Sequence, residues 1–139
     1  MPSENGWEPA RVGPGVAEWT QIPGTNVTLQ LLDGQPLQIL RAFAADFNAY
    51  VEPLRDADSA AYTPTNSVPT SNHLNGTAMD LNWNGADGRT FRLGIPEDRA
   101  YPGDKSRKLR ELLAFYEDTV YCGGFWDIRD WMHFQMGYG

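Results

Sequence analysis

The sequence is poor in cysteine and in basic residues, and each shortage excludes a class of protein. Its 139 residues include one cysteine, Cys122, so neither an internal disulfide nor a multi-cysteine zinc knuckle can form. Lys and Arg number 11 against 18 Asp and Glu, which gives a formal net charge of −7. Because there is also no basic run, the chain is a poor candidate for binding the phosphates of DNA or RNA.

Long apolar runs are also missing, so the sequence predicts no membrane span. Residues 1–6 lack the basic and apolar regions of a signal peptide, and none is expected. The hydrophobic content of 41% is ordinary for a globular protein, and the length suits one domain over residues 1–139. Frequent Pro and Gly in residues 1–24 predict an irregular N-terminal arm, anchored by Trp7 and Trp19.

Apolar periodicity predicts an α+β fold, in which a small antiparallel sheet is flanked by two main helices with long loops. Steps of three and four residues after Pro36 predict a helix ending near Pro53, and a second helix is expected from Asp104 or Ser106 to about Tyr121. Alternation and turn residues predict the strands, which are expected at 25–32, 78–83, 90–93, 125–126 and 131–136.

The two histidines stand in contexts that favour metal binding. His73 lies seven residues before Asp80, a separation of roughly 23–25 Å if extended, so two ligands of one ion require the chain to double back. Gly76 is the residue that permits such a turn. Asp80 is expected on the strand face opposite Met79 and Leu81, where it either needs a partner or lies on a solvated polar face.

His133 lies in the last expected strand, where parity turns Met132, Phe134 and Met136 toward the core and His133 the other way. A histidine on the same sheet face as Asp80 could complete a metal site. Asp130 has the wrong parity for a continuous strand, so it can act beside His133 only from a turn or bulge before the strand begins.

Together these motifs resemble a known family. The pattern from Ser71 through His73, Gly76 and Ala78 to Asp80, followed about fifty residues later by Asp130-x-x-His133, resembles the zinc D-Ala-D-Ala carboxypeptidases and L-Ala-D-Glu endopeptidases (VanY/M15-like). With the upstream Ala61-Tyr62, the chain is most similar to the peptidase domains of mycobacteriophage endolysins.

The resemblance implies a Hedgehog/DD-peptidase-like fold and a single Zn²⁺ cofactor. It implies that His73, Asp80 and His133 are the zinc ligands and that Asp130 is the catalytic carboxylate. Asp127 lies close enough in sequence to compete for that role, but Asp130 matches the carboxylate-x-x-His spacing. Possible hydrogen-bond partners for the two imidazoles are Asp127, Asn75 and Asn82, with no basis for a choice.

In one respect the sequence departs from the family. Members usually carry an arginine just after the tyrosine of the upstream loop, where it stabilises the oxyanion, whereas Thr63 follows Tyr62 here. Ser71, Asn72 and Gln135 are candidates for that role, and Arg55 is a weaker one. Trp131 is the aromatic residue best placed to line a substrate groove.

The function implied is hydrolysis of the stem peptide of bacterial peptidoglycan by a monomeric, bacteriolytic phage enzyme. It would be made in the host cytoplasm without a signal peptide and would then act on the cell wall. The L-Ala–D-Glu bond is favoured over D-Ala–D-Ala because gripping a free terminal carboxylate usually needs a cation. Two alternatives are a non-catalytic, metal-stabilised cell-wall-binding module and a site that holds another divalent ion for a different hydrolysis.

Overall fold

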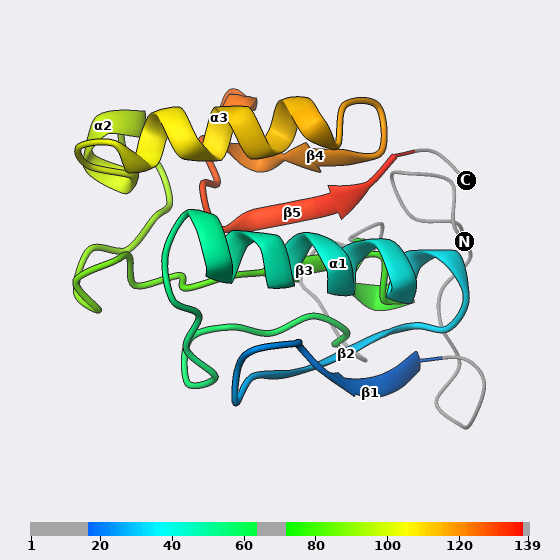
Figure 1. Ribbon diagram of the computed structural model, residues 1–139. Helices are drawn as coiled ribbons and strands as arrows, with labels where there is room; N and C mark the ends of the chain where they lie inside the picture. Colours follow the sequence, from blue (N-terminus) through cyan, green and yellow to red (C-terminus); the bar gives the residue numbers. More distant parts are fainter. Residues whose placement is uncertain (1–16, 64–71, 138–139) are drawn as a thin grey trace.

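Two small antiparallel sheets and two main helices make up the described part of the chain, residues 17–63 and 72–137, in the computed structural model (Figure 1). This arrangement confirms the predicted α+β class. No helix in these two ranges is both long and apolar enough to cross a membrane. In chain order the elements are β1 (Ala17–Gln21), β2 (Thr28–Leu32), α1 (Gln35–Tyr50), η1 (Asn72–Asn75), β3 (Ala78–Asp80), α2 (Glu97–Ala100), α3 (Lys105–Phe115), β4 (Val120–Cys122), η2 (Gly123–Phe125) and β5 (His133–Met136).

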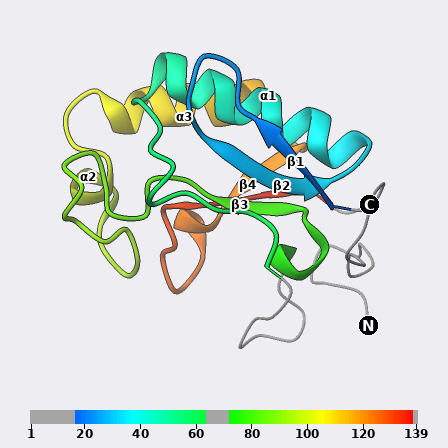
Figure 2. The same ribbon diagram turned by 90° about the horizontal axis from the view of Figure 1, so that it is seen from below.

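The helices α1 and α3 cover one side of the three-stranded sheet, whereas η1 and η2 lie on the other (Figure 2). On α1, the predicted apolar stripe is buried, with Leu40, Phe43 and Phe47 fully inaccessible to solvent. Phe134 of β5 meets this stripe, and its ring centroid lies 5.0 Å from that of Phe43 and 5.7 Å from that of Phe47. Aromatic contacts therefore fix which face of β5 is turned to the core.

Strand pairing in this sheet sets the position of the polar side chains. The strand order is β3-β5-β4, with antiparallel neighbours, and the register places Asp80 directly opposite His133. Residues opposite each other in an antiparallel pair project from the same face. Because Phe134 faces the helices, the neighbouring His133 and its partner Asp80 face the side of η1 and η2.

At the N-terminal end, the expectation of an irregular arm over residues 1–24 is wrong for Ala17–Gln21, which form β1. Its partner β2 lies within the predicted strand 25–32 and buries Leu29 and Leu31, as expected. Trp19 is no anchor, since 70% of its surface is exposed. The backbone hydrogen bonds of β2 order this segment despite its Pro and Gly neighbours. Trp7 lies outside the described residues.

The expected strands 78–83 and 131–136 are present but shorter, as β3 and β5, and three other predicted elements differ from the structure. Residues 90–93 form no hairpin strand, although the Arg92 amide donates to the Trp83 carbonyl at 2.9 Å. Residues 125–126 are not a strand either, and Val120–Cys122 instead pair with β5. The second helix ends at Phe115 and not near Tyr121, because residues 120–122 pair with β5 and the chain must turn before them. The pairing of these residues in the sheet outweighs their apolar helical spacing.

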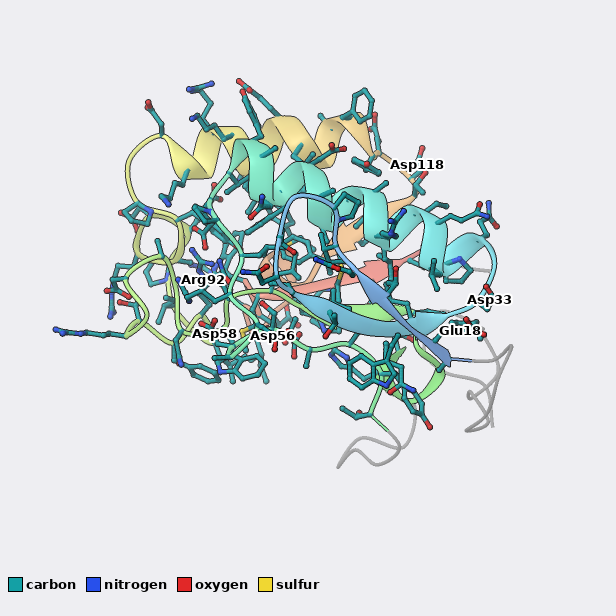
Figure 3. The ribbon with its side chains drawn as sticks, turned by 60° about the horizontal axis from the view of Figure 1, so that its bottom comes forward. Glu18, Asp33, Asp56, Asp58, Arg92 and Asp118 are labelled. Atoms are coloured by element: carbon teal, nitrogen blue, oxygen red, sulfur yellow. The ribbon has the colours of Figure 1, made fainter. Side chains whose placement is uncertain are left out.

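A buried ion pair joins the loops to this core. The side chain of Arg92, which is labelled in Figure 3, is fully buried. Both of its terminal nitrogens lie 2.7 Å from the carboxylate oxygens of Glu52. Asn82 Nδ2 donates to Glu52 Oε2 at 2.8 Å, and the Arg92 guanidinium lies 4.0 Å from the centre of the Tyr101 ring. Burial raises the pKa of Glu52, but the bonds from Arg92 outweigh it and the net pKa is lowered.

We predict that Glu52→Gln destabilises the fold by about 3–5 kcal/mol, because it leaves the Arg92 charge buried without a counterion. Urea unfolding would measure this, with the exposed Glu117→Gln as a control within about 0.5 kcal/mol of wild type. Since the folded-state pKa of Glu52 is lowered, its stabilisation is present above the unfolded pKa and is lost as the pH falls through the folded one. An acid-induced loss of stability equally steep in Glu52→Gln would contradict this assignment.

Candidate metal centre

Three side chains from separate elements converge on the sheet face away from the helices. His73, Asp80 and His133 each offer one possible ligand atom, and these atoms lie within 4.8 Å of one another. Asp80 Oδ1 is 3.4 Å from His73 Nε2 and 3.3 Å from His133 Nδ1. The structure thus brings together the three residues that the sequence analysis associated with a metal.

His73 reaches this point through the turn that Gly76 makes. Gly76 has a φ of 72°, and a Cβ there would lie 2.7 Å from the backbone nitrogen of Leu32. Glycine alone satisfies both constraints, and the chain doubles back as predicted. His73 Nδ1 lies 2.8 Å from the Ala61 carbonyl, which can only accept, so Nδ1 carries the proton. The Nε2 atom that faces Asp80 is therefore the one with a lone pair when the ring is neutral.

His133 is oriented in the complementary way. Its Nε2 lies 2.8 Å from Gln135 Oε1, to which it donates, so Nδ1 faces Asp80 and carries the lone pair when the ring is neutral. Such a hydrogen bond to the far nitrogen fixes both the tautomer and the ring angle of a metal-binding histidine. The backbone of Ala61 and the side chain of Gln135 thus supply the orientation that the sequence analysis sought from Asp127, Asn75 or Asn82.

Asp80 supplies the negative charge of the group, and its side chain is only partly exposed, at 26%. Its Oδ1 is buried and receives no hydrogen bond from any residue in the described ranges. Burial opposes ionisation, yet the contacts with His133 and His73 hold the pKa of Asp80 well below its usual range. Burial likewise lowers the pKa of His73, and Asp80 raises it by more. A buried anionic oxygen between two imidazole nitrogens, without a donor, fits a cation better than any uncharged occupant.

Asp130 occupies the position that its spacing requires. It precedes β5 and pairs with Leu93 in an isolated bridge, and its carbonyl accepts the amide of His133 at 3.3 Å. This turn before the strand confirms the predicted placement. Asp130 Oδ1 is buried, and among the described residues no donor reaches it. Burial raises the pKa of Asp130, and the charge of Asp80 raises it further.

The other residues that the sequence suggested for the oxyanion or the substrate groove are not among the three converging side chains. Ser71 lies outside the described residues, and Asn72 is buried in η1, where its carbonyl accepts the Thr77 amide at 3.1 Å. Trp131 is only 2% exposed, and its indole nitrogen donates to the Ile95 carbonyl at 2.8 Å. Arg55 is held by Asp58, with Nε 2.9 Å from Oδ1, and so belongs to the loop network.

Two site features escaped the sequence analysis. Gln135 was considered for the oxyanion and not as a partner of His133, although positions two apart on a strand share a face. That spacing was a usable signal. Ala61 acts through its backbone carbonyl, whose position depends on Ala60 pairing with Asp80 along the outer side of β3, which side-chain patterns do not encode.

Comparison with known proteins extends the interpretation of this geometry. The model of the D-alanyl-D-alanine carboxypeptidase family matches residues 64–136, more than half of the chain, and the match includes all three converging residues and Asp130. No curated protein and no solved structure matches the chain. The chain therefore belongs to the D-alanyl-D-alanine carboxypeptidase family, whose members are metallopeptidases that act on peptidoglycan.

Proposed function

We propose that the protein is a zinc-dependent peptidase of the peptidoglycan stem peptide, acting as the lytic domain of a phage endolysin. The single observation that carries the proposal is the convergence, beside Asp130, of two oriented imidazoles and one carboxylate whose Oδ1 is buried. The endolysin role and the choice of the L-Ala–D-Glu bond rest on the resemblance of the motifs. The family membership supports the broader class of reaction.

Zinc suits this donor set. His73 Nε2, Asp80 and His133 Nδ1 would hold it, and three protein ligands with an open position are typical of catalytic zinc, whereas structural sites have four. The chemistry that zinc supplies when bound is Lewis acidity, which polarises a carbonyl group and acidifies a water molecule. The hydrogen bonds to Ala61 and Gln135 hold the proton on the far nitrogen of each ring, so that each neutral ring presents its lone pair toward Asp80.

Asp130 is the proposed general base and acid. Its carboxylate takes a proton from the attacking water and returns it to the nitrogen of the leaving amine. Both histidines are committed to the metal group, so neither is available for this task. Burial and the nearby Asp80 raise the pKa of Asp130, which suits a carboxyl group that must hold the proton before passing it on.

The decisive experiment is incubation of the zinc-loaded protein with purified peptidoglycan. We expect new amino termini, with D-Glu exposed if L-Ala–D-Glu is cut and free D-Ala released if the carboxypeptidase reaction dominates. A metal chelator should abolish the release, and added zinc should restore it. Binding to peptidoglycan without any new amino termini would overturn the proposal and would favour the non-catalytic wall-binding module.

We predict that Asp130→Ala lowers the rate of hydrolysis by about 10²–10⁴-fold, the usual range for loss of a general base. Zinc content, measured by elemental analysis, and the thermal unfolding temperature should stay near the wild-type values because Asp130 is not a proposed ligand. Asp118→Asn, at the edge of the molecule after α3 (Figure 3), is the matched control and should retain full activity. A loss of zinc from Asp130→Ala would make Asp130 a ligand and would refute its assignment as the base.

We also predict that Gln135→Ala weakens zinc binding by about 10- to 100-fold, because His133 loses the acceptor that fixes its tautomer. Competition with a fluorescent chelator would measure the affinity. Gln38→Ala on the exposed surface of α1 should leave the affinity unchanged. Equal zinc affinities for the wild type and Gln135→Ala would show that the Gln135 contact does not orient the ligand.

A further inference from the structure

A pocket of about 440 Å³ adjoins the metal centre. Trp126 lines the pocket, and its ring contacts that of His133, with centroids 5.0 Å apart. One wall of the pocket is therefore in direct contact with a histidine of the candidate metal centre. Its lining residues come from α2, α3 and the segment around η2, and they are Glu97, Arg110, Gly124, Phe125, Trp126, Asp127, Arg129 and Trp131.

The pocket wall next to the candidate metal centre is closely packed. A Cβ on Gly124 would come within 1.9 Å of the Trp131 ring, so this glycine lets the turn lie directly against the indole. The Gly123 carbonyl accepts the Asp130 amide at 2.9 Å, which ties the same turn to the proposed base. The pocket and the reacting groups are therefore held in one fixed relation.

Two arginines line the pocket, and of these only Arg110 has an ion-pair partner among the described residues. Arg110 Nε lies 2.8 Å from Glu97 Oε2, and Ser106 Oγ also donates to this carboxylate, so Glu97 neutralises Arg110. By contrast, Arg129 forms no ion pair with any residue in the described ranges. Arg129 is exposed, and the exposed rings of Phe125 and Trp126 line the same pocket. A guanidinium without an acidic partner, in a pocket that also offers aromatic surface, is suited to bind a carboxylate on a small organic group.

We propose that this pocket binds the residue that follows the scissile bond, with Arg129 holding a carboxylate of that residue. The proposal rests on the proposed function. Asp130 returns its proton to the leaving amine, which belongs to the residue after the bond. Arg129 precedes Asp130 in the chain, and the carbonyl of Gly123 in the η2 turn accepts the Asp130 amide at 2.9 Å. Because the pocket is thus built next to the proposed proton donor to the leaving amine, we assign it to the leaving-group side.

Two substrates carry this chemistry. In an L-Ala–D-Glu endopeptidase substrate the carboxylate is the free carboxyl group of D-Glu, and in a carboxypeptidase substrate it is the chain terminus. Asp127 also lines the pocket and forms no ion pair within the described ranges, so its negative charge opposes a carboxylate. Arg129 and Asp127 should therefore affect the affinity for acidic peptides in opposite directions.

The test measures binding by tryptophan fluorescence in zinc-loaded Asp130→Ala, with two pairs of peptides. One pair carries D-Glu after L-Ala, with its second carboxyl group free or as the carboxamide. The other pair ends in D-Ala-D-Ala, with a free terminus or a terminal carboxamide. We expect the acid to bind about 10- to 100-fold more tightly than the amide in one pair, and that pair identifies the source of the carboxylate.

Variants of the same protein assign the preference to Arg129. Adding Arg129→Gln should reduce the acid-to-amide ratio to less than about threefold, Arg129→Lys should retain part of it, and Asp127→Asn should increase it about two- to fivefold. Arg89→Gln, an exposed arginine outside the pocket, is the control and should keep the full ratio. Unchanged thermal unfolding would show that Arg129→Gln is folded.

The outcomes separate this proposal from the proposed function. No acid preference in either pair, or a preference that survives Arg129→Gln, overturns the pocket assignment even if the wild type hydrolyses peptidoglycan. An Arg129-dependent preference in a protein that releases no amino termini supports the pocket and overturns the peptidase proposal.

Discussion

The antiparallel register of β3 and β5 is the constraint on which the site depends. It sets Asp80 opposite His133, and the same pairing sends Phe134 into the aromatic core against α1. A shift of one residue would turn His133 toward the helices and expose Phe134. The burial of the Phe134 ring therefore holds the neighbouring His133 in place. One strand thus contributes both to the stability of the core and to the geometry of the candidate site.

Around this register, backbone and side-chain acceptors decide which nitrogen of each neutral imidazole carries the proton. Ala61 and Gln135 each accept the proton of the nitrogen that faces away from Asp80. The neutral rings thus adopt different tautomers, and in both of them the lone pair is turned toward one buried carboxylate oxygen. Nothing in that arrangement satisfies the oxygen as a hydrogen-bond acceptor within the described residues, and a divalent cation would do so.

Most of the buried or pocket-lining charges outside the metal site are paired with each other. Glu52 and Arg92 form a buried ion pair between the loops and the core, and Glu97 forms an ion pair with Arg110 at the pocket. Asp80 and Asp130 lie at the candidate metal centre, whereas Arg129 lines the adjoining pocket. An acidic chain with few cations can therefore still offer a guanidinium without an ion-pair partner among the described residues, in a pocket next to the candidate metal centre.

Local pattern in the sequence determined the α+β class, the apolar faces of α1 and β5, the turn at Gly76 and the position of Asp130 before β5, because periodicity, parity and glycine conformation act over a few residues. Longer-range features required the tertiary structure. Residues 17–21 become β1 only because β2 supplies its hydrogen bonds, and the Ala61 carbonyl reaches His73 only because Ala60 pairs with Asp80. Likewise, Arg110 of α3 and Arg129 line the same pocket although they are far apart in the chain. Such contacts join residues distant in the chain, so their positions are decided by packing and sheet pairing rather than by any local residue pattern.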